Sequence, residues 1–405
     1  MKKPELLAPA GNMEKLKIAI HYGADAVYLG KKSFSLRAVK GGFIDDGEIV
    51  EAVSYAHTKG VKVYVTVNIF PHNRELSEIK RHLSFLNELM PDGIIVADPG
   101  IFLMAKELAP KIPLHVSTQA NTTNIEAIRF WQRLGAKRIN LARELSLEEI
   151  REISKNRPDV ELELFVHGAV CISYSGRCYI SSFLTGRSAN LGECTNSCRW
   201  NYALMEETRR GEYFPVFEDE RGSYLMNSRD LCLVEYLPEL IEAGIDSFKI
   251  EGRMKGVNYV AGVVHTYRKA LDAIFDGKTF EKERYLKELM AFSSRGYTTG
   301  MLLGRQTFQG YNYEGRQDLM TQDVVGIVRE KRDGKALVEL KRRLAKGMTI
   351  FFLSPSIEDK PFTVNNIWTD ESENLPLSNA GTFVFIDAPE ETRVLDIVRT
   401  SKIED

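Results

Sequence analysis

The sequence predicts an α/β fold, a TIM-type (β/α)8 barrel followed by a small antiparallel β-barrel domain. Eight short runs rich in β-branched residues alternate with longer amphipathic stretches over about the first 250 residues. Strands that alternate with helices pair in parallel, and eight parallel strands are the number that closes a barrel. After Asp323 the pattern changes to short strands separated by turns such as Asp333-Gly334 and Lys346-Gly347, which is typical of an antiparallel sheet.

The expected barrel strands follow one another in chain order. They are Glu5–Ala10, Asp25–Gly30, Lys62–Asn68, Gly93–Asp98, Leu114–Gln119, Arg138–Ala142, Glu161–His167 and Ser247–Gly252. Helices are expected at Met13–Tyr22, Asp46–Thr58, Glu75–Leu89, Ile125–Leu134, Leu147–Lys155 and Tyr259–Phe275. Ser146 and Glu149 form a capping box at one helix start. No Gly-x-Gly-x-x-Gly follows the first strand, so the pattern favours a barrel over a dinucleotide-binding sheet.

Three segments are expected along the chain. Residues 1–277 would form the barrel, with a Cys-rich insertion at 168–246, and a segment this long inside a barrel is usually functional. Residues 278–318, rich in Gly, Tyr and Arg, would form a linker, and residues 319–405 the small β-barrel domain. The expected strands of that domain are Val324–Arg329, Ala336–Leu340, Met348–Phe352, Phe383–Ile386 and Val394–Arg399.

The composition is that of a globular protein with a large core. Hydrophobic residues make up 43% and charged residues 27%, and the formal net charge is −2. That charge gives no overall attraction to nucleic acid or to an anionic membrane. Pro4 and Glu5 interrupt what would be the apolar core of a signal peptide, and no apolar run has the length of a membrane span. We therefore expect a cytoplasmic protein with no membrane partner.

One local stretch is basic. Residues 316–346 contain nine Lys and Arg against five Asp and Glu. Such an excess is usual on the solvated face of a small β-domain. The alternative is a surface that meets the phosphates of a nucleic acid.

The cysteines are concentrated in the insertion. Cys171 and Cys178 follow the seventh strand, and Cys194, Cys198 and Cys232 come later in the same segment. Structural disulfides are rare in cytosolic proteins, whereas four thiolates that meet at one point bind zinc or an iron–sulfur cluster. The spacing lacks the two Cys-x-x-Cys pairs of a zinc ribbon. A cluster, a zinc ion and unligated thiols all remain open, and five cysteines compete for four positions.

Polar side chains follow several expected strands, at the end where a parallel barrel has its mouth. They are Asn68, Asp98, Ser117, Gln119, Glu251 and Arg253, with Lys249 and Lys255 around the last strand end and Arg37 after the second strand. Two fixed cations beside a carboxylate suit a site for a small dicarboxylate, because a guanidinium grips a carboxylate with two hydrogen bonds. The alternative is a salt bridge inside the barrel.

His167 stands at the end of the seventh strand, close to the cysteines in the chain. It is a candidate ligand or catalytic group, and the alternative is a hydrogen-bonded core residue. Glu163 and Glu251 complete the set of candidate catalytic residues.

Several motifs resemble those of the collagenase-like peptidase family U32. They are Pro4 to Gly11 (PELLAPAG), His115 to Gln119 (HVSTQ), Glu163 to Cys171 (ELFVHGAVC), Ser175 to Cys178 (SGRC) and Lys249 to Lys255 (KIEGRMK). Gly192 to Trp200 (GECTNSCRW) and the trailing β-domain are similar to the tRNA hydroxylation branch of that family. The resemblance covers nearly the whole chain.

The resemblance implies prephenate-dependent formation of 5-hydroxyuridine at the wobble position of tRNA. It implies a 4Fe-4S cluster on Cys171, Cys178, Cys194 and Cys232, with Cys198 as the alternative ligand and zinc as a replacement in samples purified in air. The implied partners are tRNA, a small dicarboxylate and a second subunit, either another copy of the chain or a paralogue.

The leading hypothesis from the sequence is therefore a tRNA uridine hydroxylase component. The alternatives are a collagenase-like peptidase and a non-catalytic RNA-binding scaffold. No nucleophile elbow and no His-Glu-x-x-His motif is present in the sequence, which counts against two common classes of peptidase.

Overall fold

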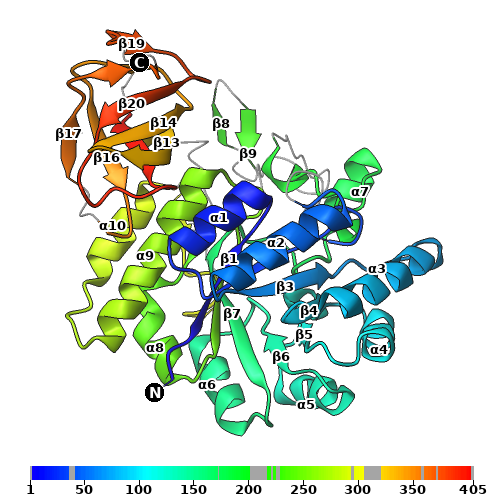
Figure 1. Ribbon diagram of the computed structural model, residues 1–405. Coiled ribbons are helices and arrows are strands. Elements are labelled where there is room, and N and C mark those ends of the chain that lie inside the picture. The colour runs from blue at the N-terminus through cyan, green and yellow to red at the C-terminus, as the bar shows by residue number, and fades with distance from the viewer. Residues whose placement is uncertain are drawn as a thin grey trace.

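Eight parallel strands close into a barrel in the computed structural model (Figure 1). They are β1 (Glu5–Pro9), β2 (Ala26–Leu29), β3 (Lys62–Val67), β4 (Gly93–Val96), β5 (Leu114–Val116), β6 (Arg138–Asn140), β7 (Glu161–Gly168) and β11 (Ser247–Ile250). Each strand pairs with the next, and β11 pairs with both β7 and β1, which closes the ring. All eight predicted strands are confirmed. The structure describes residues 2–35, 42–171, 173–200, 217–219, 222–224, 229–292, 296–304, 321–356, 360–370 and 373–402.

Helices surround the barrel. They are α1 (Met13–His21), α2 (Asp46–Thr58), α3 (Leu76–Leu89), α4 (Pro99–Leu108), α5 (Ile125–Leu134), α6 (Leu147–Asn156), α8 (Leu237–Glu242), α9 (Val257–Phe275) and α10 (Lys282–Met290). Side-chain caps explain where several begin: Asn12, Asp45, Asn124 and Ser146 each accept a backbone N–H of the first turn. Asp98, expected to project into the barrel mouth, is such a cap, because its carboxylate accepts the Ile101 N–H at 3.0 Å.

The insertion between β7 and β11 leaves the barrel at its mouth and returns beside β7. It contains α7 (Ile180–Thr185), the β8 (Phe217–Asp219) and β9 (Gly222–Tyr224) hairpin, and β10 (Asp230–Cys232). Strand β10 is antiparallel to β7, with Leu231 opposite Gly168 and Cys232 opposite His167. Part of the expected linker is also structured, since it forms α10 and β12 (Tyr297–Thr298), and β12 pairs with β10.

The C-terminal domain is an antiparallel half-barrel with its own apolar core. Its main sheet runs in the order β17 (Pro361–Thr363), β16 (Thr349–Leu353), β21 (Ile397–Ser401), β13 (Gln322–Arg332), β14 (Lys335–Leu340), β20 (Phe383–Asp387) and β18 (Ile367–Trp368). A separate pair joins β15 (Leu344–Ala345) to β19 (Leu377–Ser378). The five predicted strands of the small antiparallel β-domain are present, and its main sheet forms a half-barrel.

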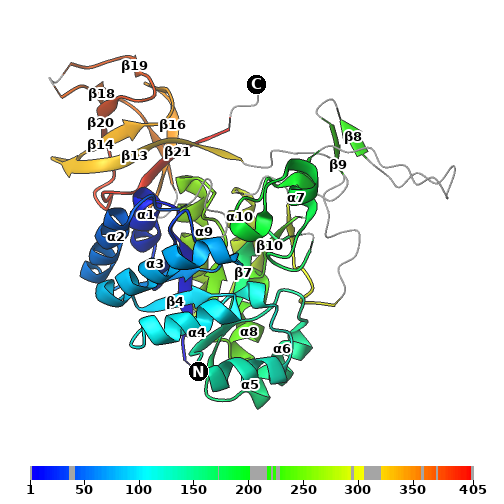
Figure 2. The ribbon, with the colours of Figure 1, turned by 90° about the vertical axis from the view of Figure 1, so that its right-hand side faces the viewer.

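The half-barrel docks on the barrel at the end opposite the N-terminus, near α1, and α7 lies at the same end (Figures 1 and 2). Tyr22, directly after α1, is fully buried in this interface. Its hydroxyl donates to the Leu353 carbonyl at 2.6 Å and accepts the Ile397 N–H at 3.0 Å. Beside it, Nε2 of His21 hydrogen-bonds the Asp396 carboxylate at 2.7 Å. Within the described ranges, no helix has the length and apolar character needed to cross a membrane.

Tyr22→Phe is expected to weaken the docking of the half-barrel. The change leaves the Leu353 carbonyl and the Ile397 N–H buried without their common partner, which costs about 1–3 kcal/mol for such groups. Urea denaturation should show this loss of stability, and limited proteolysis should release the C-terminal domain earlier. Tyr55→Phe, at a half-buried position on α2, should change stability by less than about 0.5 kcal/mol. Equal stability of Tyr22→Phe and wild type would contradict this role.

Candidate functional site

A pocket of about 1050 Å³, including space open to solvent, lies where the carboxyl ends of the barrel strands meet the insertion. Barrel enzymes keep their active sites at this end. The strand ends contribute Tyr28, Thr66, Asn68, Ser117, Thr118, Gln119, Arg143, Phe165, Lys249, Glu251, Arg253 and Met254. The insertion contributes Val170, Cys171, Ser175, Gly176, Cys178, Ala189, Cys194, Asn196 and Cys198. Residues from seven sequence regions thus share one cavity.

Two buried cations from the last strand and its exit line this pocket. The Lys249 ammonium lies 2.8 Å from the Glu163 carboxylate and 4.6 Å from the centre of the Tyr28 ring. Burial lowers the pKa of Lys249, and the Glu163 charge opposes that shift. Arg253 donates to the Ser35 and Thr66 hydroxyls at 2.5 and 3.2 Å, which fixes the orientation of its guanidinium. Both cations are therefore held in place by side chains from other parts of the barrel.

Glu251 lies between the two cations in sequence and in the pocket wall. Its carboxylate accepts a hydrogen bond from the Tyr28 hydroxyl at 3.1 Å, and the same hydroxyl is 3.0 Å from the Ile250 carbonyl. The carboxylate is nearly buried, with 6% of the residue surface exposed. The predicted grouping of Lys249, Glu251 and Arg253 at the mouth is thus present.

Side-chain amides and hydroxyls form the opposite wall. Asn68 donates to the Gln119 side-chain oxygen at 2.6 Å, and Gln119 donates back to the Asn68 carbonyl at 2.8 Å. Ser117 donates to the same Gln119 oxygen at 3.1 Å. This closed network holds three of the predicted substrate-binding residues in one fixed arrangement, a polar surface able to hydrogen-bond a bound molecule.

Arg143 is a pocket residue that the sequence analysis missed. It donates to the Ala169 carbonyl at 2.7 Å, and its guanidinium lies 3.9 Å from the centre of the Phe165 ring. Its position directly after the sixth expected strand was the available signal, because strand ends line the mouth. With Lys249 and Arg253 it brings the pocket to three cations.

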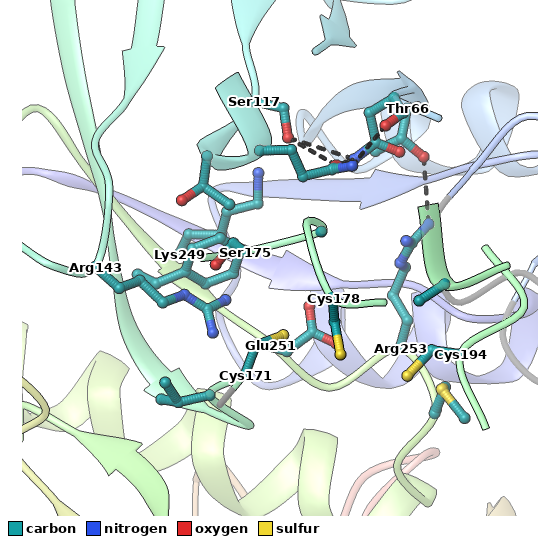
Figure 3. Close-up of a pocket in the computed structure, with 18 of the residues that line it drawn as sticks. Thr66, Ser117, Arg143, Cys171, Ser175, Cys178, Cys194, Lys249, Glu251 and Arg253 are labelled. Carbon is teal, nitrogen blue, oxygen red and sulfur yellow. Dashed lines mark hydrogen bonds between the residues drawn. The ribbon is translucent and has the colours of Figure 1, made fainter. Parts of the chain in front are cut away.

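Four cysteines line the pocket from the insertion: Cys171, Cys178, Cys194 and Cys198. Figure 3 shows Cys171, Cys178 and Cys194 on the same side as Glu251, with Ser117 and Thr66 on the opposite side. All four are partly exposed and none is in a disulfide. The thiols therefore share the cavity with the cations of the barrel strands.

A close backbone contact seats the insertion on the barrel. Gly176 has a φ of +73°, and a Cβ atom there would lie 2.8 Å from Cγ of Gln119. Any larger residue would push the loop of Cys171 and Cys178 away from the strand ends, since a positive φ and a close approach both favour glycine. The position of these two cysteines over the mouth thus depends on Gly176.

The cysteines offer sulfur ligands to an inorganic centre. Sulfur-only ligation selects zinc or an iron–sulfur cluster. Among the described residues, no three His, Cys, Asp or Glu side chains converge tightly enough to hold one metal ion. A four-iron cluster makes a different demand, because each cysteine binds a different iron and the sulfurs stand farther apart than ligands of a single ion. Four thiols spread around one cavity fit the donor chemistry of such a cluster.

Cys232 and His167 are not among the residues that line the pocket. Cys232, on β10, is buried, and its sulfur is 3.8 Å from the Tyr267 hydroxyl, while burial raises the pKa of its thiol to about 12. The His167 ring packs against Tyr259, Tyr267 and Tyr297, and burial lowers its pKa to about 3. The imidazole is therefore neutral at physiological pH and sits among tyrosine rings.

The remaining predicted residues have structural contacts or lie outside the described ranges. Glu163 is buried beneath the pocket, where it also accepts from Asn140 at 2.7 Å and pairs with Arg138 at 3.4 Å. Lys255 forms an ion pair with Asp230 at 3.0 Å. Arg37 lies outside the described residues. Glu163 thus acts on the pocket through Lys249 and not by direct contact.

Ion pairs reduce the positive charge of the basic stretch in the half-barrel. Arg329 pairs with Glu14 and Glu339, and Arg342 pairs with Asp323. Less of the stretch is available to an anionic partner than its composition suggests.

Comparisons with known proteins identify a family and relatives within it. The model of peptidase family U32 matches residues 11–311, and the model of the U32 C-terminal domain matches residues 320–399. A Bacillus subtilis protein named tRNA hydroxylation protein P1 is 42% identical over 378 residues, which cover 92% of this chain and 89% of that protein. An Escherichia coli protein named tRNA hydroxylation protein P is 38% identical over 434 residues, covering 96% and 95%. A 23S rRNA 5-hydroxycytidine synthase of Escherichia coli is 40% identical over 272 residues, covering 67% of this chain and 40% of that protein.

Glu163→Gln is expected to destabilise the barrel by about 3–5 kcal/mol at pH 7, because Lys249 would keep a buried charge without its carboxylate. The loss relative to wild type should shrink as the pH rises toward about 10, where lysine in the unfolded chain also loses its proton. Urea denaturation at both pH values measures this. Glu161→Gln, a half-exposed partner of Arg138, should cost less than about 1 kcal/mol. A pH-independent loss would contradict the assignment to Lys249.

Proposed function

The chain belongs to peptidase family U32, and from that premise we propose that it is an RNA-hydroxylating enzyme that acts on tRNA. Two relatives that match almost all of the chain carry names of tRNA hydroxylation proteins, and a third is named for the synthesis of a hydroxylated base in rRNA. The common element in these names is hydroxylation of a pyrimidine or of tRNA. That shared element supports the proposal.

One observation of the pocket supports the proposal of an RNA-hydroxylating enzyme. Four cysteines from the insertion line the same cavity as Lys249, Arg253 and Arg143 from the strand ends. A peptidase that uses one nucleophile has no evident need for four thiols in one cavity. Thiols beside fixed cations suit a redox reaction on an anionic substrate, because thiolates bind redox metals and cations neutralise carboxylates.

We propose the wobble uridine as the target base and 5-hydroxyuridine as the product. The conversion replaces the hydrogen on C5 with a hydroxyl group, which is a two-electron oxidation that adds one oxygen atom. A co-substrate that supplies the oxygen atom and takes up the two electrons must therefore accompany the RNA, and the charge of the pocket suits prephenate, a dicarboxylate, in that role. The choice of the wobble uridine and of prephenate rests on the resemblance to the tRNA hydroxylation branch.

The pocket residues have distinct roles in this scheme. Arg253 and Lys249 would bind the carboxylates of the co-substrate, and Arg143 would add a third positive charge. Gln119, fixed by Asn68, would hydrogen-bond the uracil edge or the co-substrate. Glu251, fixed by Tyr28, is the group placed to accept a proton in the cavity.

We propose that the thiols hold a 4Fe-4S cluster. When bound, such a cluster would supply one-electron transfer to the reaction. Cys171, Cys178 and Cys194 would provide three ligands, and their position in the cavity wall supports this. The fourth ligand would be Cys198, which lines the same cavity, whereas Cys232 is buried and is not among the residues that line it.

Peptidase activity has less support. A cysteine peptidase needs an imidazole within hydrogen-bonding reach of its nucleophile. The ring partners of His167 are three tyrosines, and burial keeps its pKa near 3, well below the value of a useful general base.

Arg253→Gln is expected to lower 5-hydroxyuridine formation at least about tenfold, because a fixed cation would be lost from the substrate pocket. The test expresses each variant in a bacterial strain that lacks its own tRNA hydroxylases and measures wobble nucleosides by mass spectrometry. The matched control is Arg151→Gln, at an exposed ion pair with Glu242 on the outer helices, which should restore the nucleoside as wild type does. If wild type restores no hydroxyuridine, the proposed function is wrong.

Cys198→Ser is expected to lose cluster iron and Cys232→Ser to retain it. Anaerobically purified wild type should contain about four irons per chain and absorb visible light, as a four-cysteine cubane requires. Iron and sulfide analysis of both variants measures the difference. The reverse result would give the fourth position to Cys232, and full iron content in a Cys171→Ser, Cys178→Ser double variant would refute a cluster at this site.

A further inference from the structure

Aromatic side chains are exposed on the cysteine-bearing part of the insertion. Tyr174, Tyr179, Phe183 and Trp200 expose 56%, 72%, 79% and 42% of their surface. We call these four residues the aromatic rim. Large rings are normally buried, and exposed apolar side chains that gather on one segment mark an interaction surface.

The aromatic rim is built on the same unit as the pocket cysteines. Ser181, in the first turn of α7, is buried and accepts the Thr195 N–H at 3.1 Å, with its hydroxyl 4.0 Å from the Cys194 sulfur. Phe183 lies two residues further along the same short helix and is exposed. One side of α7 therefore fixes the Cys194 loop, while its other side presents a ring to solvent.

Positive charge accompanies the rings. Residues 173–200 contain three Arg and one Glu, with no Lys and no Asp. The Arg177 guanidinium lies 4.1 Å from the centre of the Phe70 ring, so it is oriented by a barrel residue. This charge pattern complements a polyanion, although the chain as a whole has a net charge of −2.

Exposed aromatic rings beside arginines are the combination that binds unpaired nucleotides. Each ring can stack on a base, and the arginines meet the phosphates. A double-stranded stem offers no free base face, whereas a loop does. The pocket lies next to this segment, so a base that has left its stack would enter between the cysteines and the strand ends.

We propose that the aromatic rim is the platform on which unpaired bases of a tRNA loop stack, next to the base that enters the cysteine pocket. The inference rests on the proposed function for the identity of the RNA. It adds the location of the loop, the residues that hold it and the preference for unpaired over paired nucleotides. The rim would supply stacking energy, and α7, which carries Phe183, lies at the same end of the barrel as the half-barrel (Figures 1 and 2).

The test measures binding of fluorescent RNA to the full chain by anisotropy at fixed salt. The probes are an anticodon stem-loop and a blunt duplex with the sequence of its stem. Wild type should prefer the stem-loop, and Tyr179→Ala combined with Phe183→Ala should weaken stem-loop binding by about tenfold per ring removed. Duplex binding, which depends on charge, should change little.

Two further variants control for general effects. Phe130→Ala removes a ring of comparable exposure, 51%, from α5 on the outer face of the barrel, and should bind as wild type does. Phe183→Trp keeps a stacking surface and should retain the preference for the stem-loop. Circular dichroism and iron content of each variant confirm that fold and cluster are unchanged.

Several outcomes would overturn the inference. Wild-type affinity in the double alanine variant would do so, as would equal binding of duplex and stem-loop by wild type. A change in sedimentation mass of the double variant with unchanged RNA binding would assign the rim to self-association instead. Loss of stem-loop binding in the double variant, in a protein that forms no hydroxyuridine, would keep the inference and refute only the proposed function.

Discussion

The pairing of β7 with β11 is the constraint on which the rest of the structure depends. These strands are separated by the whole insertion, yet Ser247 lies opposite Glu163 and Phe248 opposite Leu164 in one parallel ladder. The same seam carries the buried ion pair between Glu163 and Lys249. Closing the ring there brings the last strand, with its cations, next to the strand from which the cysteine segment departs. Without this pairing the two halves of the pocket would lie on opposite edges of an open sheet.

The fold was largely accessible from the sequence. Alternation of buried strands with capped helices is a local signal, repeated eight times, and eight repeats leave few arrangements other than a barrel. The same pattern predicted the residues of the mouth, because the ends of the strands fix their places. They are Asn68, Ser117, Gln119, Glu251 and Arg253. Asp98 was wrongly predicted to project into the mouth. An aspartate after a strand can also cap the next helix, and here its carboxylate caps α4.

Other features could not be predicted from the sequence, because they depend on how distant segments pack together. Which cysteines share a cavity depends on how an irregular segment folds back, and the sequence spacing of Cys198 and Cys232 carries no such information. The tyrosine cage around His167 draws on residues far along the chain, from α9 and β12. The open edge of the C-terminal sheet depends on strand register, which turn residues alone do not specify. These three features are set by contacts between residues far apart in the chain, which the local sequence pattern does not encode.

The exit and return of the insertion have a mechanical consequence. The chain leaves the barrel at Gly168 and comes back at Leu231, and these two residues face each other on one rung. The described residues between them are therefore tethered at both ends by one strand pairing. An insertion tethered in this way adds functional side chains to the mouth, while the order and register of the eight barrel strands stay those of an uninterrupted ring.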